Sequence, residues 1–137
     1  MQVVVHDVQR QAPVRAARMA RLARCAIRRL RMRTSGVLSI AFVNARHMRQ
    51  LNQQFLRHDR STDVLSFRYD GERVVGDIVI APSEARRYAR AHGLSYDAEL
   101  SRYVVHGILH WLGHEDRTLA QQRRMRLIED RLLNGCP

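Results

Sequence analysis

The most informative run of this 137-residue sequence reads His106-Gly107-Ile108-Leu109-His110-Trp111-Leu112-Gly113-His114-Glu115-Asp116. On an α-helix, a spacing of four residues places His106 and His110 on one face, one turn apart. Two neutral imidazoles in this arrangement supply half of the four ligands that a zinc ion takes. We therefore predict that this run contains a metal-binding helix.

The third metal ligand should come from beyond Gly113, because glycine commonly ends a helix and lets the chain turn back. We favour Asp116, with Glu115 and His114 as alternatives. His114 continues the spacing of four, but at ~1.5 Å per residue its Cα would lie ~12 Å from that of His106 on a straight helix. One zinc ion with bonds of ~2.0–2.1 Å to nitrogen does not easily span that distance.

The residues leading into this run are nearly all apolar, which predicts a buried central helix from Ser95 or Asp97 to Leu112. Periodicity and capping residues predict strands at 2–5, 37–43, 62–67 and 74–80, and further helices at 13–32, 44–55, 82–93 and 118–133. Ser83 is the predicted cap of the third of these helices, and Asp70-Gly71 predicts a hairpin turn. The expected fold is α+β: a single small domain over residues 1–137, with a mixed β-sheet packed with helices.

The formal net charge is +11, and every basic residue is arginine. An excess of this size indicates a polyanionic partner, for which RNA or the ribosome is the natural candidate. Five arginines (18, 21, 24, 28 and 31) share one face of the helix predicted at 13–32. They form either a stripe that contacts phosphates or an ordinary solvated face.

The location of the protein is expected to be cytoplasmic. No apolar run reaches eighteen residues, so we expect no membrane span, and the first residues show no secretory signal. Cys25 and Cys136 lie far apart in the sequence and do not look like a disulfide framework, which fits a reducing compartment.

The motif differs from that of the His-Glu-x-x-His metalloproteases at one important position. Those enzymes carry their general base directly after the first histidine, where this chain has Gly107. A metal held by two histidines and one carboxylate still leaves a position for water and polarises a phosphoryl oxygen. Together with many arginines, which bind phosphate, the pattern favours cleavage of a phosphodiester, with RNA as the preferred substrate.

At this point the sequence resembles the YbeY family of bacterial rRNA-maturation endoribonucleases. The family motif His-Gly-x-Leu-His-Leu-x-Gly-Tyr-Asp-His corresponds to residues 106–116. A second signature matches Leu51-Asn52 and Thr62-Asp63-Val64-Leu65-Ser66-Phe67, and a third matches Gly76-Asp77-Ile78-Val79-Ile80. The three motifs occur in family order and cover nearly the whole chain.

This resemblance implies an α+β fold and a zinc-dependent endoribonuclease specific for single-stranded RNA, with one Zn²⁺ per chain. It implies a role in maturation of the 3′ end of 16S rRNA and in ribosome quality control, with rRNA and the small ribosomal subunit as partners. His106, His110 and Asp116 would hold the metal, and the two histidines would also serve catalysis.

Two positions depart from the family pattern. Asp116 stands where the family has its third histidine ligand, and a carboxylate should leave the metal a weaker Lewis acid. Leu56 stands where the family has an arginine thought to assist catalysis, and Arg57 follows it. Arg57 is therefore the candidate catalytic arginine, or else a plain surface residue.

Two other functions compete with the active nuclease. In the first, the altered ligand and the missing arginine have removed hydrolysis, and the chain is a non-catalytic, metal-stapled ribosome-assembly or RNA-binding factor. In the second, the chain is a metal hydrolase for another substrate, with Glu115 or Asp77 as its base. Asp63, Ser66 and Asp77 either line the metal pocket or form strand-end hydrogen bonds.

Overall fold

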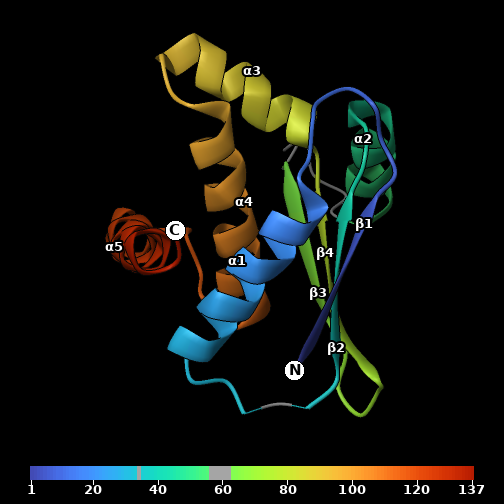
Figure 1. Cartoon of the computed structure of the whole chain (residues 1–137), viewed down its shortest axis with the longest axis vertical. Helices are drawn as coiled ribbons and strands as arrows, with labels where there is room; N and C mark the ends of the chain where they lie inside the picture. The colour runs from blue at the N-terminus through green and yellow to red at the C-terminus, as the bar shows by residue number, and fades with distance from the viewer. Residues whose placement is uncertain (34, 56–62) are drawn as a thin grey trace.

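The computed structural model describes residues 1–33, 35–55 and 63–137 (Figure 1). The elements occur in the order β1 (Gln2–Asp7), α1 (Ala16–Arg29), β2 (Val37–Phe42), α2 (Ala45–Phe55), β3 (Val64–Arg68), β4 (Val74–Ile80), α3 (Pro82–His92), α4 (Tyr96–Trp111) and α5 (Leu119–Gly135). This order follows the sequence prediction element by element. Arg57 lies outside the described residues, as does Leu56.

The four strands form one mixed sheet in the order β1-β2-β4-β3. β2 pairs in parallel with both β1 and β4, whereas β3 pairs antiparallel with β4 across the predicted Asp70-Gly71 turn. The predicted α+β fold with a mixed sheet is therefore confirmed.

The helices cover the sheet unequally. α1 and α4 lie against one face, and α5 lies outside α4 (Figure 1). The main core is on this side and includes the fully buried Leu38, Ile40 and Phe42 of β2. α2 covers part of the other face through Met48, in a smaller cluster with Val79. The sheet therefore supports α4 from one side while α5 confines it from the other.

α4 is the buried central helix that the sequence predicted. Ser95 caps its first turn by accepting a hydrogen bond from the Ala98 N–H, and the helix ends at Trp111. Its contact with the sheet is close at Gly107, where a Cβ would come within 2.6 Å of Ile78 Cγ2 and 3.1 Å of Val64 Cγ1. The glycine that follows the first histidine thus lets the metal-binding helix approach β3 and β4.

Replacing Gly107 with alanine is expected to destabilise the protein by about 1–3 kcal/mol, because the added methyl group overpacks this contact. In an unconstrained helix the same change stabilises, by up to ~1 kcal/mol. The free energy of unfolding, measured by urea denaturation, shows whether the substitution destabilises or stabilises the protein. The exposed Ala98 of the same helix provides the control, since Ala98→Gly should cost only the intrinsic propensity. A stabilised Gly107→Ala variant would contradict the close packing.

One predicted helix cap is wrong. Ser83 does not cap α3; the N-cap is Ala81, and Pro82 occupies the first helical position, for which its fixed φ and missing N–H suit it. The Ser83 hydroxyl is instead buried, and no hydrogen-bond partner for it lies in the described part of the chain. The other caps agree with prediction: Gly93 ends α3 at φ +63°, and Thr118 begins α5 in a capping box with Gln121.

The expectation of two separate cysteines is also wrong. Cys25 of α1 and Cys136, which follows α5, form a disulfide with a Cα–Cα distance of 5.9 Å. Their separation of 111 residues concealed this, because packing brings the end of the chain back beside α1. The disulfide removes the argument for a reducing compartment that rested on unpaired cysteines. No helix in the described ranges has the length and apolar character required to cross a bilayer.

Opening this disulfide should lower the free energy of unfolding by about 2 kcal/mol, because a cross-link over a long loop restricts the unfolded chain. Urea denaturation of the oxidised protein with and without a thiol reductant measures the effect. The double variant Cys25→Ser/Cys136→Ser should match the reduced protein and should not respond to reductant. Equal midpoints for all samples would show that the cross-link does not stabilise the fold.

Candidate metal centre

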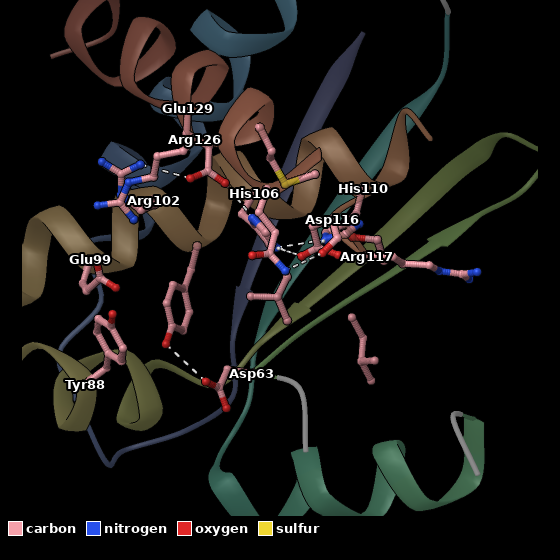
Figure 2. A pocket seen from close by; sticks show the side chains of 16 residues that line it. Asp63, Tyr88, Glu99, Arg102, His106, His110, Asp116, Arg117, Arg126 and Glu129 are labelled. Atoms are coloured by element: carbon pink, nitrogen blue, oxygen red, sulfur yellow. Dashed lines mark hydrogen bonds and ion pairs between the residues drawn. The ribbon is translucent and has the colours of Figure 1, made fainter. Parts of the chain in front are cut away.

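His106, His110 and Asp116 point their side chains toward one another at the end of α4 (Figure 2). The two Nε2 atoms of the histidines are 2.9 Å apart, and Asp116 Oδ2 lies 3.5 Å from His106 Nε2 and 3.4 Å from His110 Nε2. Ligand atoms of a tetrahedral ion with bonds of ~2.0–2.1 Å lie roughly 3.4 Å apart. Two edges of the triangle match this value and the edge between the histidines is shorter, so the three ligand atoms lie close enough together to share one small metal ion.

A tight turn after α4 brings Asp116 to the histidines. Gly113 has φ +93°, and the N–H groups of Gly113 and His114 donate to the carbonyls of His110 and Leu109. This pattern closes the helix and reverses the chain. The returning loop is then fixed because the Gln122 side chain donates to the Asp116 carbonyl.

The two alternative third ligands lie elsewhere. His114 and Glu115 line a separate, smaller hollow with Arg124, and the Glu115 carboxylate accepts a hydrogen bond of 3.5 Å from Gln121. Within the described ranges, His106, His110 and Asp116 form the one group of three such side chains whose ligand atoms converge. The geometry therefore favours Asp116 among the three candidates.

A buried carboxylate lies directly behind His106. Glu129 of α5 is 4 % exposed, and its Oε2 is 2.6 Å from His106 Nδ1, while its Oε1 accepts from Arg102 Nη1 at 3.0 Å. Since an ionised carboxylate can only accept, this contact favours the His106 tautomer that has its proton on Nδ1 and its Nε2 lone pair toward the cluster. Arg102 also binds Asp130 of α5 at 2.8 Å. These two contacts of Arg102 help to hold Glu129 in place against His106.

Sequence reasoning missed Glu129, although a signal was present. The buried face of α5 runs through Met125, Glu129 and Leu132, so the glutamate occupies an inward position of the helical period. A charged residue at such a position requires a buried partner. It is this period, and not any motif, that could have pointed to Glu129.

The electrostatics of the cluster favour an uncharged His110. Burial lowers the pKa of His110, and the neighbouring His106 lowers it further, while Asp116 opposes both effects. A neutral imidazole is the form that donates a lone pair to a metal ion. The cluster is therefore suited to binding a cation near neutral pH.

The cluster opens on a cavity of about 900 Å³ between α4, α5, α3 and β3 (Figure 2). Three arginines line it, Arg102, Arg117 and Arg126. Ser66 also lines it and donates a hydrogen bond of 2.8 Å to the Gly107 carbonyl, so it fixes α4 to β3. Asp63 lines the cavity and accepts from the Tyr103 hydroxyl, whereas Asp77 is not among the lining residues and accepts from Tyr69.

The fold and the cluster define a class of protein: a small α+β domain whose buried helix and following loop carry a three-residue metal-binding group. Comparison with known families is more specific, because the family model described as "Endoribonuclease YbeY" matches residues 5–136. The chain belongs to the endoribonuclease YbeY family. The resemblance seen in the three motifs is thereby confirmed.

Individual relatives agree with this assignment. The endoribonuclease YbeY of Flavobacterium psychrophilum is 35% identical over 102 residues, which cover 74% of this chain and 73% of that protein. The endoribonuclease YbeY of Myxococcus xanthus is 38% identical over 112 residues, covering 76% of this chain but 38% of that longer protein. The solution structure of TM1509 from Thermotoga maritima shares the fold, with a TM-score of 0.63 and 22% identity over 97% of this chain and 89% of that one.

Proposed function

We propose that this chain is a zinc-dependent endoribonuclease that cleaves single-stranded RNA. The observation that carries the proposal is the convergence of His106, His110 and Asp116 on a cavity that arginines also line. The curated relatives bear the name endoribonuclease YbeY, which supports RNA as the substrate. Single strands fit such a cavity better than duplexes, because their bases are free to enter it.

His106, His110 and Asp116 would hold one Zn²⁺ per chain, which accepts nitrogen and carboxylate ligands together. Zinc in such a site polarises a phosphoryl oxygen and lowers the pKa of water toward neutrality. Glu129 would orient His106 for this ligand set, because it accepts the Nδ1 proton.

Arginines of this chain would bind the RNA phosphates. Arg117 and Arg126 line the cavity with exposed side chains, and each offers a planar fork of donors to a phosphate. Arg57 remains our candidate catalytic arginine by sequence. Four arginines of the predicted stripe lie on α1 (18, 21, 24 and 28), whereas Arg31 lies beyond the end of the helix at Arg29, with φ +54°. The four are largely exposed, although Arg18 is half-buried and paired with Asp97. They suit either a phosphate surface or a solvated face.

We further propose that the substrate is the 3′ end of 16S rRNA and that the small ribosomal subunit is the partner. The family resemblance supports this role, as does a net charge of +11, which favours binding to a polyanion. A role on nascent ribosomes would place the chain in the cytoplasm.

The experiment compares wild type with Asp116→Ala, both purified without chelator. Metal content is measured by mass spectrometry, and cleavage of a labelled single-stranded RNA is followed on gels. We expect about one zinc per wild-type chain and metal-dependent cleavage, with both lost in the variant. The loop should persist in the variant, because Gln122 binds the backbone carbonyl of Asp116.

Other outcomes discriminate among the alternatives. Zinc retained by Asp116→Ala would move the third ligand to His114 or Glu115. Stoichiometric zinc without RNA cleavage would favour the non-catalytic, metal-stapled assembly factor. Cleavage of a small phosphodiester or peptide in place of RNA would favour another hydrolase.

A further inference from the structure

The cavity continues well beyond the metal cluster, along one face of α4. Glu99, Tyr103, His106 and His110 lie at intervals of three and four residues and all line it. Glu99 is seven residues before His106, which is a rise of roughly 10 Å along the helix. The cavity therefore has a metal end and a distant end, both built on the same helix.

The distant end carries carboxylates and an aromatic ring. Arg117 lies beside Asp116 at the metal end, whereas Arg102 and Arg126 lie on the side of His106 toward Glu99 (Figure 2). Asp63 and Glu99 supply carboxylates there, and Tyr88 of α3 faces the same space. Burial raises the pKa of the Tyr103 hydroxyl, and the charges of Asp63 and Glu99 raise it further. Arg102, which also lines the cavity, is already paired with Glu129 and Asp130. The carboxylates of Asp63 and Glu99 therefore disfavour a phosphate at this end and favour another group of the RNA chain.

Among the side chains that line the distant end, Glu99 gives the strongest indication of a bound ligand. It is 7 % exposed and lines the cavity, yet no hydrogen bond or ion pair joins its carboxylate to another residue in the described ranges. Its oxygens are open to the cavity, so they are satisfied by whatever fills the cavity and not by the protein. The exposed Asp97 already provides an acidic group in the first turn of α4, so helix stability alone does not account for Glu99.

A metal ion does not explain this end of the cavity. Among the described residues, His106, His110 and Asp116 are the one group of three side chains whose ligand atoms converge, so the carboxylates at the distant end do not form a second such group. The carboxylates therefore suit a ligand wider than a single ion. Such a ligand would present hydrogen-bond donors and an aromatic face.

We propose that this end of the cavity is a subsite for a guanine base of the RNA substrate, with Glu99 as the residue that reads it. Guanine alone among the RNA bases offers two adjacent donors, N1–H and N2–H₂, on its Watson–Crick edge. A carboxylate accepts both together. The exposed ring of Tyr88, stacked on His92 with centroids 3.9 Å apart, supplies an aromatic surface for the base.

The distance between the metal end and the Glu99 end of the cavity suits a single nucleotide. With a phosphate near the metal end, its neighbouring base reaches the Glu99 end, because both ends lie on the same face of α4. The proposal rests on the proposed ribonuclease function and adds a base preference to it. Cleavage should accordingly favour sites next to guanine.

The test measures binding of 5′-GMP, 5′-IMP and 5′-AMP to the full chain in the presence of chelator, by isothermal titration calorimetry. Inosine lacks the N2 amino group and adenine lacks both donors of guanine. We expect GMP to bind about tenfold more tightly than AMP, with IMP between them. The comparison needs no variant, so it does not depend on the folding of a mutant.

The second part of the test repeats the nucleotide titrations on the variant Glu99→Gln, with Glu72→Gln as its matched control. Glu72 is an exposed glutamate between β3 and β4, away from the cavity. Glutamine presents one acceptor and one donor, so the preference for GMP should disappear in Glu99→Gln and persist in Glu72→Gln. Equal binding of the three nucleotides, no measurable binding, or a preference unchanged in Glu99→Gln would overturn the subsite.

Failure of this inference is distinguishable from failure of the nuclease assignment. Nucleotide binding is measured without metal and without cleavage, so a chain that lacks zinc or activity still reports on the subsite. Conversely, a chain that cleaves RNA with zinc but shows no preference for guanine keeps the nuclease assignment and loses the subsite.

Discussion

The variant His110→Ala is expected to lose its zinc and at least about 100-fold of its RNA cleavage rate. His110 supplies one of three converging ligand atoms, 2.9 Å from His106 Nε2 and 3.4 Å from Asp116 Oδ2. Two remaining ligands hold zinc poorly, because structural and catalytic sites use at least three protein ligands. Loss of the ion also removes its activation of water and phosphate.

Metal content by mass spectrometry and cleavage of a labelled single-stranded RNA measure the two effects. Binding of the RNA should persist, since the arginines that contact phosphate are unchanged. His47→Ala is the matched control, because His47 is an exposed histidine on α2. Wild-type cleavage by His110→Ala would refute the assignment of the catalytic site.

Truncation of Glu129 is expected to weaken zinc binding by about 10- to 100-fold although this residue does not itself face the ion. In Glu129→Ala, His106 Nδ1 loses its acceptor at 2.6 Å, so the ring is no longer held with Nε2 toward the cluster. Glu129→Gln should recover part of the loss, because the amide oxygen still accepts from Nδ1 without the negative charge.

Competition with a chromogenic zinc chelator at fixed pH gives the dissociation constants. Asp130→Asn provides a sharp control, because Asp130 binds the same Arg102 at 2.8 Å but does not contact His106. Its zinc affinity should equal that of wild type. A comparable loss in Asp130→Asn would show that Arg102 and helix packing, and not the contact with His106, account for the effect.

Short-range sequence patterns were sufficient to predict most of the fold. The spacing of apolar residues and the caps at Ser95 and Thr118 are effects within a few residues of chain, so they can be recognised without a partner. The spacing of His106 and His110 is local in the same sense. Gly113 was enough to predict a turn, and geometry alone then favoured Asp116 over His114.

Contacts between distant segments were decided only by the tertiary structure. Glu129 reaches His106 across 23 residues, and Cys25 meets Cys136 across 111. The helical period marks Glu129 as an inward residue, but the sequence around these residues does not identify the partner of either one. The role of Gly107 also depends on Ile78, a residue of another strand. Short-range backbone preferences set the elements and the first two ligands, whereas burial and packing between elements set the support of the metal centre and the shape of its cavity.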